Sequence, residues 1–399
     1  MKRLLFIAHR IPFPPNKGDK IRSYNILKFL SARYTIDIAF LVDDTKDLQY
    51  LDELKLFASS VFFEIIPGYK KITAAIFAFI QKKPISIPYF YSKKLQYSID
   101  SQLENNIPAC VFCFSSPTAE YVFRSQYADQ LQQSSRMIMD LIDLDSLKWA
   151  QYAQHSKPFM DQIYHREARL LARYEEKIVQ EFDALLLVTE AEKQLCSPVL
   201  QEKVTVVSNG VDLVKFAPQI RKARPNNDPV LVFTGAMDYW PNIDAVIWFS
   251  REIFPSVLAL EPSARFFIVG SNPKPEVIAL GKESNIIVTG FVEDISYYVA
   301  SADVCIAPLR VARGIQNKVL EAMAMGKAVV ATPEAIEGIT EECAQQVMVA
   351  HSAEQFAKAI VHLLHEENTR IALGTRARET VELHYSWANN LAKLDSLVP

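Results

Sequence analysis

The amino-acid sequence predicts an α/β protein with two Rossmann-like domains, each built on a parallel sheet. The chain has 399 residues, which is enough for two separate hydrophobic cores. In both halves short apolar runs alternate with longer amphipathic segments, the order that gives parallel sheets covered by helices. A polar, basic stretch with prolines at 218–229 separates the halves. We therefore expect domains at 1–217 and 225–382.

The composition is that of a globular protein. Hydrophobic residues make up 50% of the chain and charged residues 22%, so it is not a disordered protein. The net charge of −3 gives no support for a nucleic-acid partner. No apolar run approaches the roughly 20 residues that span a bilayer. The run at 4–8 is too short for a signal peptide and is followed by His9 and Arg10, so we expect a cytoplasmic protein.

Five cysteines in a chain of this length do not form a disulfide framework. Cys110 and Cys113 make a C-x-x-C pattern, but their run is typical of a strand, where residues three apart point to opposite faces. We expect buried cysteines here, without a shared metal or disulfide.

The first half begins with the strand–loop–helix–strand order of a Rossmann-like domain. Strands are predicted at 3–8 and 34–42, with a helix at 20–30 between them. The intervening loop holds three prolines, then Gly18 and Asp19. A glycine there lets backbone approach a ligand, and an ordinary turn is the alternative. The loop is not G-x-G-x-x-G, so no nicotinamide cofactor is expected.

The segment 69–95 combines apolar residues with paired lysines. A mostly apolar stretch at 72–80 includes two phenylalanines and lies among six lysines: Lys70, Lys71, Lys82, Lys83, Lys93 and Lys94. A basic, aromatic, amphipathic helix of this kind can lie on an anionic membrane. A core helix with solvated ends is the alternative.

Acidic residues follow a strand predicted at 137–142, beside another at 111–114. Asp143 and Asp145 come at the carboxyl end of that strand, where open α/β sheets bind substrates. An Asp-x-Asp motif also occurs in metal sites. No further oxygen ligand can be identified from the sequence, so no metal is expected. Capping of the next helix by Asp145 is the alternative role.

In the second half, the stretch 303–332 has the pattern of strand, loop, helix, turn and strand. The strands are predicted at 304–307 and 328–331 and the helix at 316–325, with Gly326 as a left-handed C-cap. Its loop lies where open α/β folds bind ligands. Further strands of this half are predicted at 230–234, 264–269 and 286–289.

That loop is basic. Arg310 and Arg313 precede the helix and Lys318 falls in its first turn, where cations oppose the helix dipole. A bound anion would remove the conflict, because free N–H groups and basic side chains then converge on it. Glu321 lies three residues after Lys318, on the same side of the helix. An ordinary surface Lys–Glu pair is the other interpretation.

The run 314–326, Gly-Ile-Gln-Asn-Lys-Val-Leu-Glu-Ala-Met-Ala-Met-Gly, resembles the donor-site signature of the retaining GT-B glycosyltransferases of family 4. The sequence of this run is similar to that of the glycosyltransferases associated with exosortase (PEP-CTERM) exopolysaccharide systems. The resemblance implies that Lys318 meets a nucleotide diphosphate and Glu321 the ribose hydroxyls. The family's first glutamate, which faces the donor sugar, is replaced here by Arg313. The resemblance implies donor contacts for Gly314, Ile315, Gln316 and Asn317.

The same resemblance implies further donor contacts. Phe291 and Val292 lie in a loop that would hold the base through backbone groups. The loop after Gly235 lacks the arginine and lysine that many relatives direct at the diphosphate, and Arg310 is the expected replacement.

On the acceptor side, the resemblance implies that Gly18 and Asp19 line a cleft between the two domains. It places Asp143 where the family often carries a histidine that orients the acceptor hydroxyl, with Asp145 beside it. The Asn209-Gly-Val-Asp wording is typical of the end of the first domain, and 383–399 would form a helix that returns to that domain.

These residues together predict a retaining GT-B enzyme. It would transfer a sugar from a nucleotide-sugar, expected to be a UDP-sugar, to a lipid-linked or polysaccharide acceptor at the inner face of the cytoplasmic membrane. Lys318, Arg310 and the helix N-terminus would neutralise the departing diphosphate, with no metal or cofactor. A UDP-sugar 2-epimerase and an inactive nucleotide-sugar-binding scaffold remain alternatives.

Overall fold

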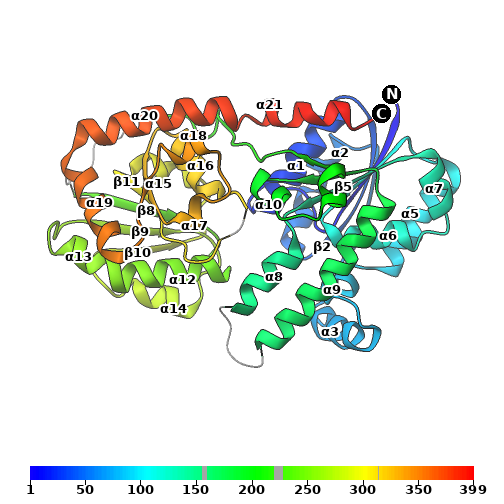
Figure 1. Cartoon of the computed structure of the whole chain (residues 1–399), viewed down its shortest axis with the longest axis horizontal. Helices are drawn as coiled ribbons and strands as arrows, with labels where there is room; N and C mark the ends of the chain where they lie inside the picture. Colours follow the sequence, from blue (N-terminus) through cyan, green and yellow to red (C-terminus); the bar gives the residue numbers. More distant parts are fainter. Residues whose placement is uncertain (155–159, 220–227, 313) are drawn as a thin grey trace. The chain divides into compact units, whose positions relative to one another are not determined.

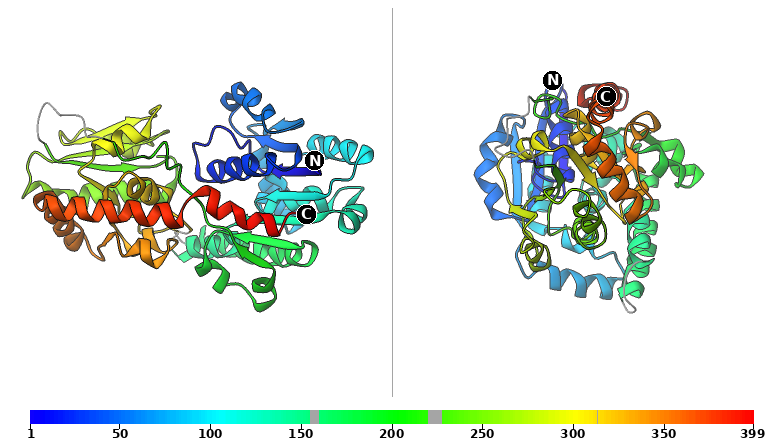
Figure 2. Two further views of the ribbon diagram at one scale, coloured as in Figure 1. Left: turned by 90° about the horizontal axis from the view of Figure 1, so that it is seen from above. Right: turned by 90° about the vertical axis from the view of Figure 1, so that its left-hand side faces the viewer.

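The computed structural model describes residues 1–399 except 155–159, 220–227 and 313. The described residues form two compact units, Met1–Ser208 with Leu391–Pro399, and Asn209–Asn390. Each unit is an α/β domain on its own parallel sheet (Figures 1 and 2). The predicted fold class of two Rossmann-like domains is therefore confirmed.

Within the described residues, the first unit has a seven-stranded sheet in the order β3-β2-β1-β4-β5-β6-β7. The strand order reverses at β1, which pairs with β2 on one side and β4 on the other, and such a switch point is where open α/β sheets place a ligand site. The strands are β1 (Arg3–Ala8), β2 (Thr35–Val42), β3 (Ser60–Ile65), β4 (Cys110–Phe114), β5 (Arg136–Ile142), β6 (Ala184–Leu187) and β7 (Val204–Val206).

Helices of the first unit cover this sheet, and α8 and α9 run side by side (Figure 1). The predicted strands agree with the structure, whereas the edge strand β3 was not predicted. The helix expected to start at residue 20 begins earlier, so that Gly18 and Asp19 form its first turn. The helices are α1 (Gly18–Ser31), α2 (Leu51–Lys55), α3 (Lys70–Gln81), α4 (Ser86–Tyr89), α5 (Lys93–Asn105), α6 (Ala119–Phe123), α7 (Ala128–Ser134), α8 (Asp145–Gln154), α9 (Met160–Glu181), α10 (Glu190–Gln194) and α11 (Pro198–Lys203).

The second unit has, among its described residues, a six-stranded sheet in the order β10-β9-β8-β11-β12-β13. Its central strands are buried along their whole length and apolar except for Thr234, as expected for parallel strands between two helical layers. The strands are β8 (Val230–Thr234), β9 (Arg265–Val269), β10 (Ile286–Gly290), β11 (Val304–Ala307), β12 (Ala328–Ala331) and β13 (Met348–Val349).

The helix of the predicted donor signature is α16 (Asn317–Ala324), and it ends as expected, because Gly326 adopts a left-handed φ of 67°. The long helix α20 crosses close to it, and a Cβ on Gly374 of α20 would lie 2.0 Å from the Gly326 carbonyl oxygen. The remaining helices are α12 (Trp240–Trp248), α13 (Phe254–Leu258), α14 (Pro275–Leu280), α15 (Ile295–Ser301), α17 (Pro333–Ile336), α18 (Glu341–Ala344), α19 (Ala353–His365) and α20 (Glu367–His384).

The boundary between the units falls at Ser208/Asn209, earlier than the expected residue 217. The reason is local pairing, because the Val211 N–H donates to the Tyr385 carbonyl and Phe216 joins the core of the second unit. The expected linker lies largely in 220–227, outside the described residues.

The returning C-terminal segment is not one helix over 383–399. Tyr385 and Ser386 separate α20 from α21 (Trp387–Leu391), which is followed by a 3-10 turn, η4 (Ala392–Ser396). The segment joins the first unit from Leu391 onward. There the Lys393 ammonium donates to the Val206 carbonyl at 3.0 Å.

The helix α3 does not present its large apolar residues to the core. Its buried residues are Ala74 and Ala78, whereas its isoleucines and phenylalanines face solvent. The alternative of an ordinary core helix is therefore wrong for this segment. Among the described residues, no helix combines the length and the apolar character that a bilayer span needs.

Candidate functional site

The candidate donor site lies at the carboxyl ends of β8 and β11 in the second unit. These strands are neighbours in the sheet, so the loops that follow them leave from the same edge. The loop after β8 leads into α12, and the loop after β11 leads into α16. Gln316 is the N-cap residue of α16, and its side chain makes no cap hydrogen bond. The first N–H groups of that helix therefore have no side-chain acceptor from the N-cap residue.

Lys318 is held in the first turn of α16 by a polar and an aromatic contact. Its ammonium donates to the Asn242 Oδ1 at 2.5 Å and lies 4.2 Å from the centre of the Phe233 ring on β8. Part of the side chain remains exposed, yet its charged end lies deep enough that burial lowers the pKa of Lys318 to about 7, against the opposing effect of Glu321. An anionic ligand would restore the full charge of this ammonium.

Glu321 lies one turn further along α16. Burial raises the pKa of its carboxyl group to about 7, although the nearby Lys215 and Lys318 cations oppose that shift. Among the described residues, none donates a hydrogen bond to this carboxylate. A buried acceptor without a protein donor has the chemistry to receive hydroxyl groups from a ligand.

Asn242 ties the two loops together, and the sequence did not identify it as a site residue. Besides accepting from Lys318, its Nδ2 donates to the Ala236 carbonyl at 2.9 Å. Gly235 leaves room for this amide, because a Cβ at that position would lie 2.6 Å from the Asn242 Nδ2. The asparagine therefore positions Lys318 and explains why a glycine follows β8.

The loop before α16 is shaped by a second glycine contact. Gly314 has a left-handed φ of 63°, and its carbonyl lies so close to Gly338 that a Cβ there would approach it to 2.3 Å. Ile315 and Asn317 are half-buried beside Lys318 in the chain. Arg313, at the position of the family's first glutamate, lies outside the described residues.

Asn209 is the first residue of the second unit. Its Nδ2 lies 3.5 Å from the Asn317 Oδ1 at the start of α16, and its carbonyl accepts from Asn390. The acceptor-side role expected for it stays a prediction.

Arg310 already has an anionic partner in the structure. Its guanidinium forms an ion pair with Asp244 of α12, with 2.9 Å between Nε and Oδ2, and lies 5.5 Å from the centre of the Trp248 ring. Half of the side chain is exposed. To contact a diphosphate, Arg310 would have to break its ion pair with Asp244. The diphosphate-binding role expected for Arg310 stays a prediction.

The loop predicted to hold the base follows β10. Gly290 has a left-handed φ of 68°, Phe291 is exposed and Val292 is half-buried. Asp294 caps α15 by accepting from the Ser296 N–H at 2.9 Å. The two residues predicted from the sequence thus lie in a short turn between the end of β10 and the N-cap of α15.

In the first unit, Asp19 anchors a charged cluster at the carboxyl end of β1. Its carboxylate lies 3.2 Å from the His9 Nε2 and accepts from the Arg10 guanidinium at 2.8 Å, and Arg10 pairs with Asp43 at 2.9 Å. Although burial favours the neutral form, His9 and Arg10 hold the pKa of Asp19 well below its usual range. Gly18 precedes Asp19 in the first turn of α1.

His9 is a candidate residue that the sequence analysis overlooked. The ring is buried between Phe90 and Phe114, and its Nδ1 has no partner among the described residues. A histidine directly after the first strand of a parallel sheet was the available signal, because ligands bind at strand carboxyl ends.

Asp143 and Asp145 lie after β5 but face different partners. The Asp143 Oδ1 is buried without a partner among the described residues, and burial together with Asp145 raises its pKa, against the effect of Lys148. Asp145 accepts from the Ser116 hydroxyl at 3.1 Å. Asp145 is the first residue of α8, and Glu175 accepts from the Ser146 N–H there, so the capping alternative for Asp145 stays a prediction.

A buried ion pair, also not predicted, lies under this cluster. The Arg22 guanidinium on α1 and the Asp140 carboxylate on β5 are fully buried and 2.7 Å apart, and Arg22 also donates to the Val207 carbonyl. Removal of one partner would leave an uncompensated buried charge, which is strongly destabilising. The pair therefore fastens α1, β5 and the segment after β7 to one another.

The described residues contain no group of three or more histidine, cysteine, aspartate or glutamate side chains placed to hold a metal ion. Cys110 and Cys113 are free buried thiols on β4, as the sequence predicted.

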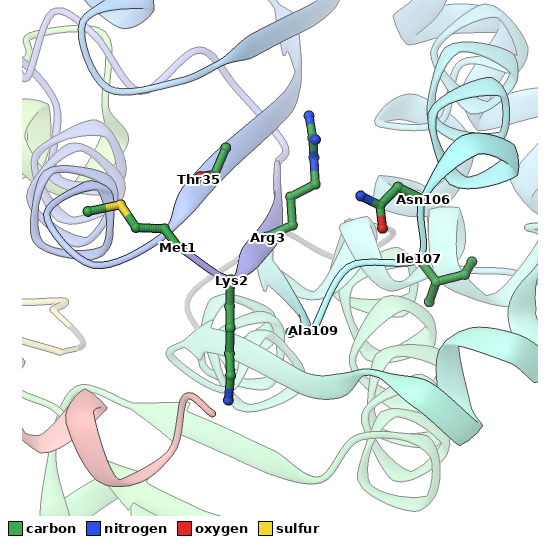
Figure 3. Close-up of a pocket in the computed structure, with 7 residues that line it drawn as sticks. All are labelled: Met1, Lys2, Arg3, Thr35, Asn106, Ile107 and Ala109. Carbon is green, nitrogen blue, oxygen red and sulfur yellow. The ribbon is translucent and has the colours of Figure 1, made fainter.

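The hollow shown in Figure 3 is unrelated to either group of site residues. It is lined at the amino ends of β1, β2 and β4 by Met1, Lys2, Arg3, Thr35, Asn106, Ile107 and Ala109. Arg3 there is already paired with Asp37 at 2.7 Å. Ligands of open α/β sheets bind at the opposite, carboxyl ends of the strands.

Residues 228–366 match a family model described as glycosyl transferases group 1. No curated protein matches the chain in sequence. Solved structures match along its whole length. Sucrose-phosphate synthase from Thermosynechococcus elongatus has a TM-score of 0.70 at 15% identity, over 100% of this chain and 98% of that chain.

Two further similar structures contain nucleotides. HepE of Anabaena in complex with UDP-glucose has a TM-score of 0.66 at 13% identity, over 99% of both chains. A variant of S. aureus TarM in complex with Fondaparinux, alpha-GlcNAc-glycerol and UDP has a TM-score of 0.67 at 12% identity, over 100% of both chains. At these identities the likeness shows the fold, which is that of the GT-B glycosyltransferases.

Proposed function

We propose that the chain is a retaining glycosyltransferase of family 4 that transfers a sugar from a UDP-sugar to a lipid-linked or polysaccharide acceptor, in the synthesis of an exopolysaccharide. The observation that carries this proposal is the pair of desolvated side chains on α16. Burial shifts the pKa of the Lys318 ammonium and of the Glu321 carboxyl group toward their neutral forms, so a bound anion and hydroxyl donors from a ligand would stabilise the charged forms. The match of residues 228–366 to glycosyl transferases group 1 supports the same conclusion.

The donor is proposed to bind with its diphosphate at the N-terminus of α16. Its phosphate oxygens would accept from the Lys318 ammonium and from the first N–H groups of the helix, and the ribose hydroxyls would donate to Glu321. Phe291 and Val292 would meet the base through backbone groups. HepE and TarM are nucleotide-bound proteins of this fold, and this makes a uridine nucleotide the first donor to test.

Catalysis is proposed to rest on stabilising the leaving group. As the bond between the anomeric carbon and the diphosphate oxygen breaks, negative charge grows on the diphosphate, and Lys318 and the helix N-terminus stabilise it. The acceptor hydroxyl attacks from the same face and passes its proton to a departing phosphate oxygen, so configuration is retained. Because the Lys318 ammonium supplies the positive charge, we propose turnover without a metal.

The acceptor is proposed to meet the strand carboxyl ends of the first unit. Asp143, whose buried Oδ1 has no partner among the described residues, is the proposed contact for a sugar hydroxyl. His9 and Asp19 lie at the carboxyl end of β1 in the same sheet. An acceptor carried on lipid would place the enzyme at the inner face of the cytoplasmic membrane.

A panel of nucleotide-sugars tests the proposal. We expect UDP and one UDP-sugar to raise the unfolding temperature, and that UDP-sugar to be slowly hydrolysed without an acceptor. Release of an epimerised free sugar would show a 2-epimerase instead. Binding of UDP without any turnover, even with lipid-linked and polysaccharide acceptors, would show a nucleotide-sugar-binding scaffold. No protection by any nucleotide would overturn the proposal as a whole.

A further inference from the structure

The helix α3 of the first unit turns its small residues to the protein and its large apolar side chains to solvent. Its small residues Ala74 and Ala78 are buried, so the side that packs against the protein offers little apolar volume. Its large apolar side chains face outward, with exposed fractions of 69% for Ile72, 55% for Ile76, 53% for Phe77, 51% for Phe79 and 71% for Ile80. Such a cluster on one helix marks an interaction surface.

Packing holds α3 in this orientation. Arg166 of α9 donates to the Ala78 carbonyl at 2.9 Å and stacks on the Phe79 ring, with 4.3 Å between the guanidinium carbon and the ring centre. At the other end, the Lys70 ammonium donates to the Tyr91 carbonyl at 2.9 Å. The outward face is therefore a consequence of contacts at both ends of the helix.

The charged residues of the chain segment that contains α3 have one sign. Residues 65–99 contain six lysines and no aspartate or glutamate, in a chain whose net charge is −3. The structure separates these lysines into two groups. Lys70 and Lys83 are engaged with the protein, the latter in an ion pair with Glu120 at 2.7 Å. The exposed lysines of the segment are Lys71, Lys82, Lys93 and Lys94.

This charge decides what covers the apolar face. In a two-fold symmetric dimer through this face, lysines would lie against lysines, which is unfavourable. An anionic bilayer offers the opposite charge together with an apolar layer, and interfacial helices bury their apolar face about 5–10 Å into that boundary. Tyr69 and Tyr97, exposed by 68% and 75%, are residues of the kind that anchor proteins at the headgroup level.

We propose that α3 docks the first unit on an anionic bilayer, with Ile72, Ile76 and Ile80 inserted and the four exposed lysines against lipid headgroups. The proposal rests on the proposed function and identifies the surface of the transferase that would contact the membrane. The two can fail separately, because vesicle binding tests the surface and protection by UDP tests the donor site.

Two variants test the surface. In one, Ile72, Ile76 and Ile80 are replaced by serine; in the other, Lys71, Lys82, Lys93 and Lys94 are replaced by glutamate. The wild-type protein is expected to sediment at low salt with vesicles that contain phosphatidylglycerol and not with pure phosphatidylcholine. Each lysine near an anionic surface is worth about fivefold in partitioning, so even two engaged lysines predict a loss of about 25-fold in the charge variant.

Matched controls come from the rest of the chain. Leu260, Ile371 and Leu383 are comparably exposed on the second unit and are replaced by serine, and Lys28, Lys46, Lys274 and Lys282 are replaced by glutamate. The control proteins should sediment like the wild type. All variants should unfold at the wild-type temperature, because the substituted side chains are exposed.

Any of four results would overturn the proposal. The first is a wild-type protein that does not bind phosphatidylglycerol vesicles at low salt. The second is equal binding to neutral vesicles, and the third is an equal loss of binding in the control variants. The fourth is a dimer in analytical ultracentrifugation that the isoleucine variant converts to a monomer, which would make a second copy the occupant of this face.

Discussion

Asn242 is expected to set the charge of Lys318, and the change Asn242→Ala tests this directly. The substitution removes the oxygen that accepts from the Lys318 ammonium at 2.5 Å and leaves the burial of that ammonium in place. A hydrogen bond to a charged group contributes about 1.5–3 kcal/mol. At 1.36 kcal/mol per pKa unit, the pKa of Lys318 should fall by about 1–2 units below its wild-type value of about 7.

The consequence for ligand binding depends on pH. If only the charged ammonium binds the diphosphate, UDP affinity follows the charged fraction of Lys318. The wild-type protein should then bind UDP about 10–100 times more tightly than the variant at pH 8, but only up to about twice as tightly at pH 5. Protonation of UDP itself affects both proteins alike and cancels in this ratio.

Isothermal titration calorimetry of UDP between pH 5 and 8 measures the ratio. Asn285→Ala is the matched control. The Asn285 Nδ2 also donates to a backbone carbonyl, that of Ala264 at 2.9 Å, but it lies near β9 and β10, away from Lys318. Asn242→Ala also removes the hydrogen bond to the Ala236 carbonyl, and thermal unfolding reports that loss separately. A ratio that stays constant with pH would refute the reasoning, because a purely structural role would weaken binding equally at every pH.

Three further predictions concern the same site and its surroundings. Lys318→Ala should reduce turnover by about 10²–10³, the usual effect of losing one charge-stabilising group, and near wild-type turnover would contradict the site. Glu321→Gln should weaken UDP binding but raise the unfolding temperature at pH 7. The pKa of Glu321 in the folded protein, about 7, lies above its ordinary value of 4.5, so the wild type loses stability as pH rises from 4.5 to 7. Activity should survive a chelator, and its abolition with recovery on added Mn²⁺ or Mg²⁺ would revive Asp143 and Asp145 as ligands.

The strands and the donor helix were predictable because their signals are local. Apolar runs at 3–8, 304–307 and 328–331 are too short for helices and are bounded by turn residues, and the structure forms β1, β11 and β12 there. The spacing of Lys318 and Glu321 places them on one side of a helix whatever the rest of the chain does. β3 escaped prediction because a half-buried edge strand carries a weaker apolar signal.

What the sequence determined by itself is the class of fold, the order of its elements, and the positions of the basic loop and of the lysine-rich segment. Only the tertiary structure decided which side chains meet. Asn242 accepts a hydrogen bond from Lys318, 76 residues away in the sequence. Arg310 pairs with Asp244 over a sequence separation of 66 residues, and Arg22 pairs with Asp140 over 118. The direction in which α3 points was likewise decided by Arg166, 88 residues beyond Ala78. Periodicity and propensity describe neighbours within a few turns of chain, whereas these contacts arise when a sheet brings distant strand ends to one edge and a helix finds its place against another.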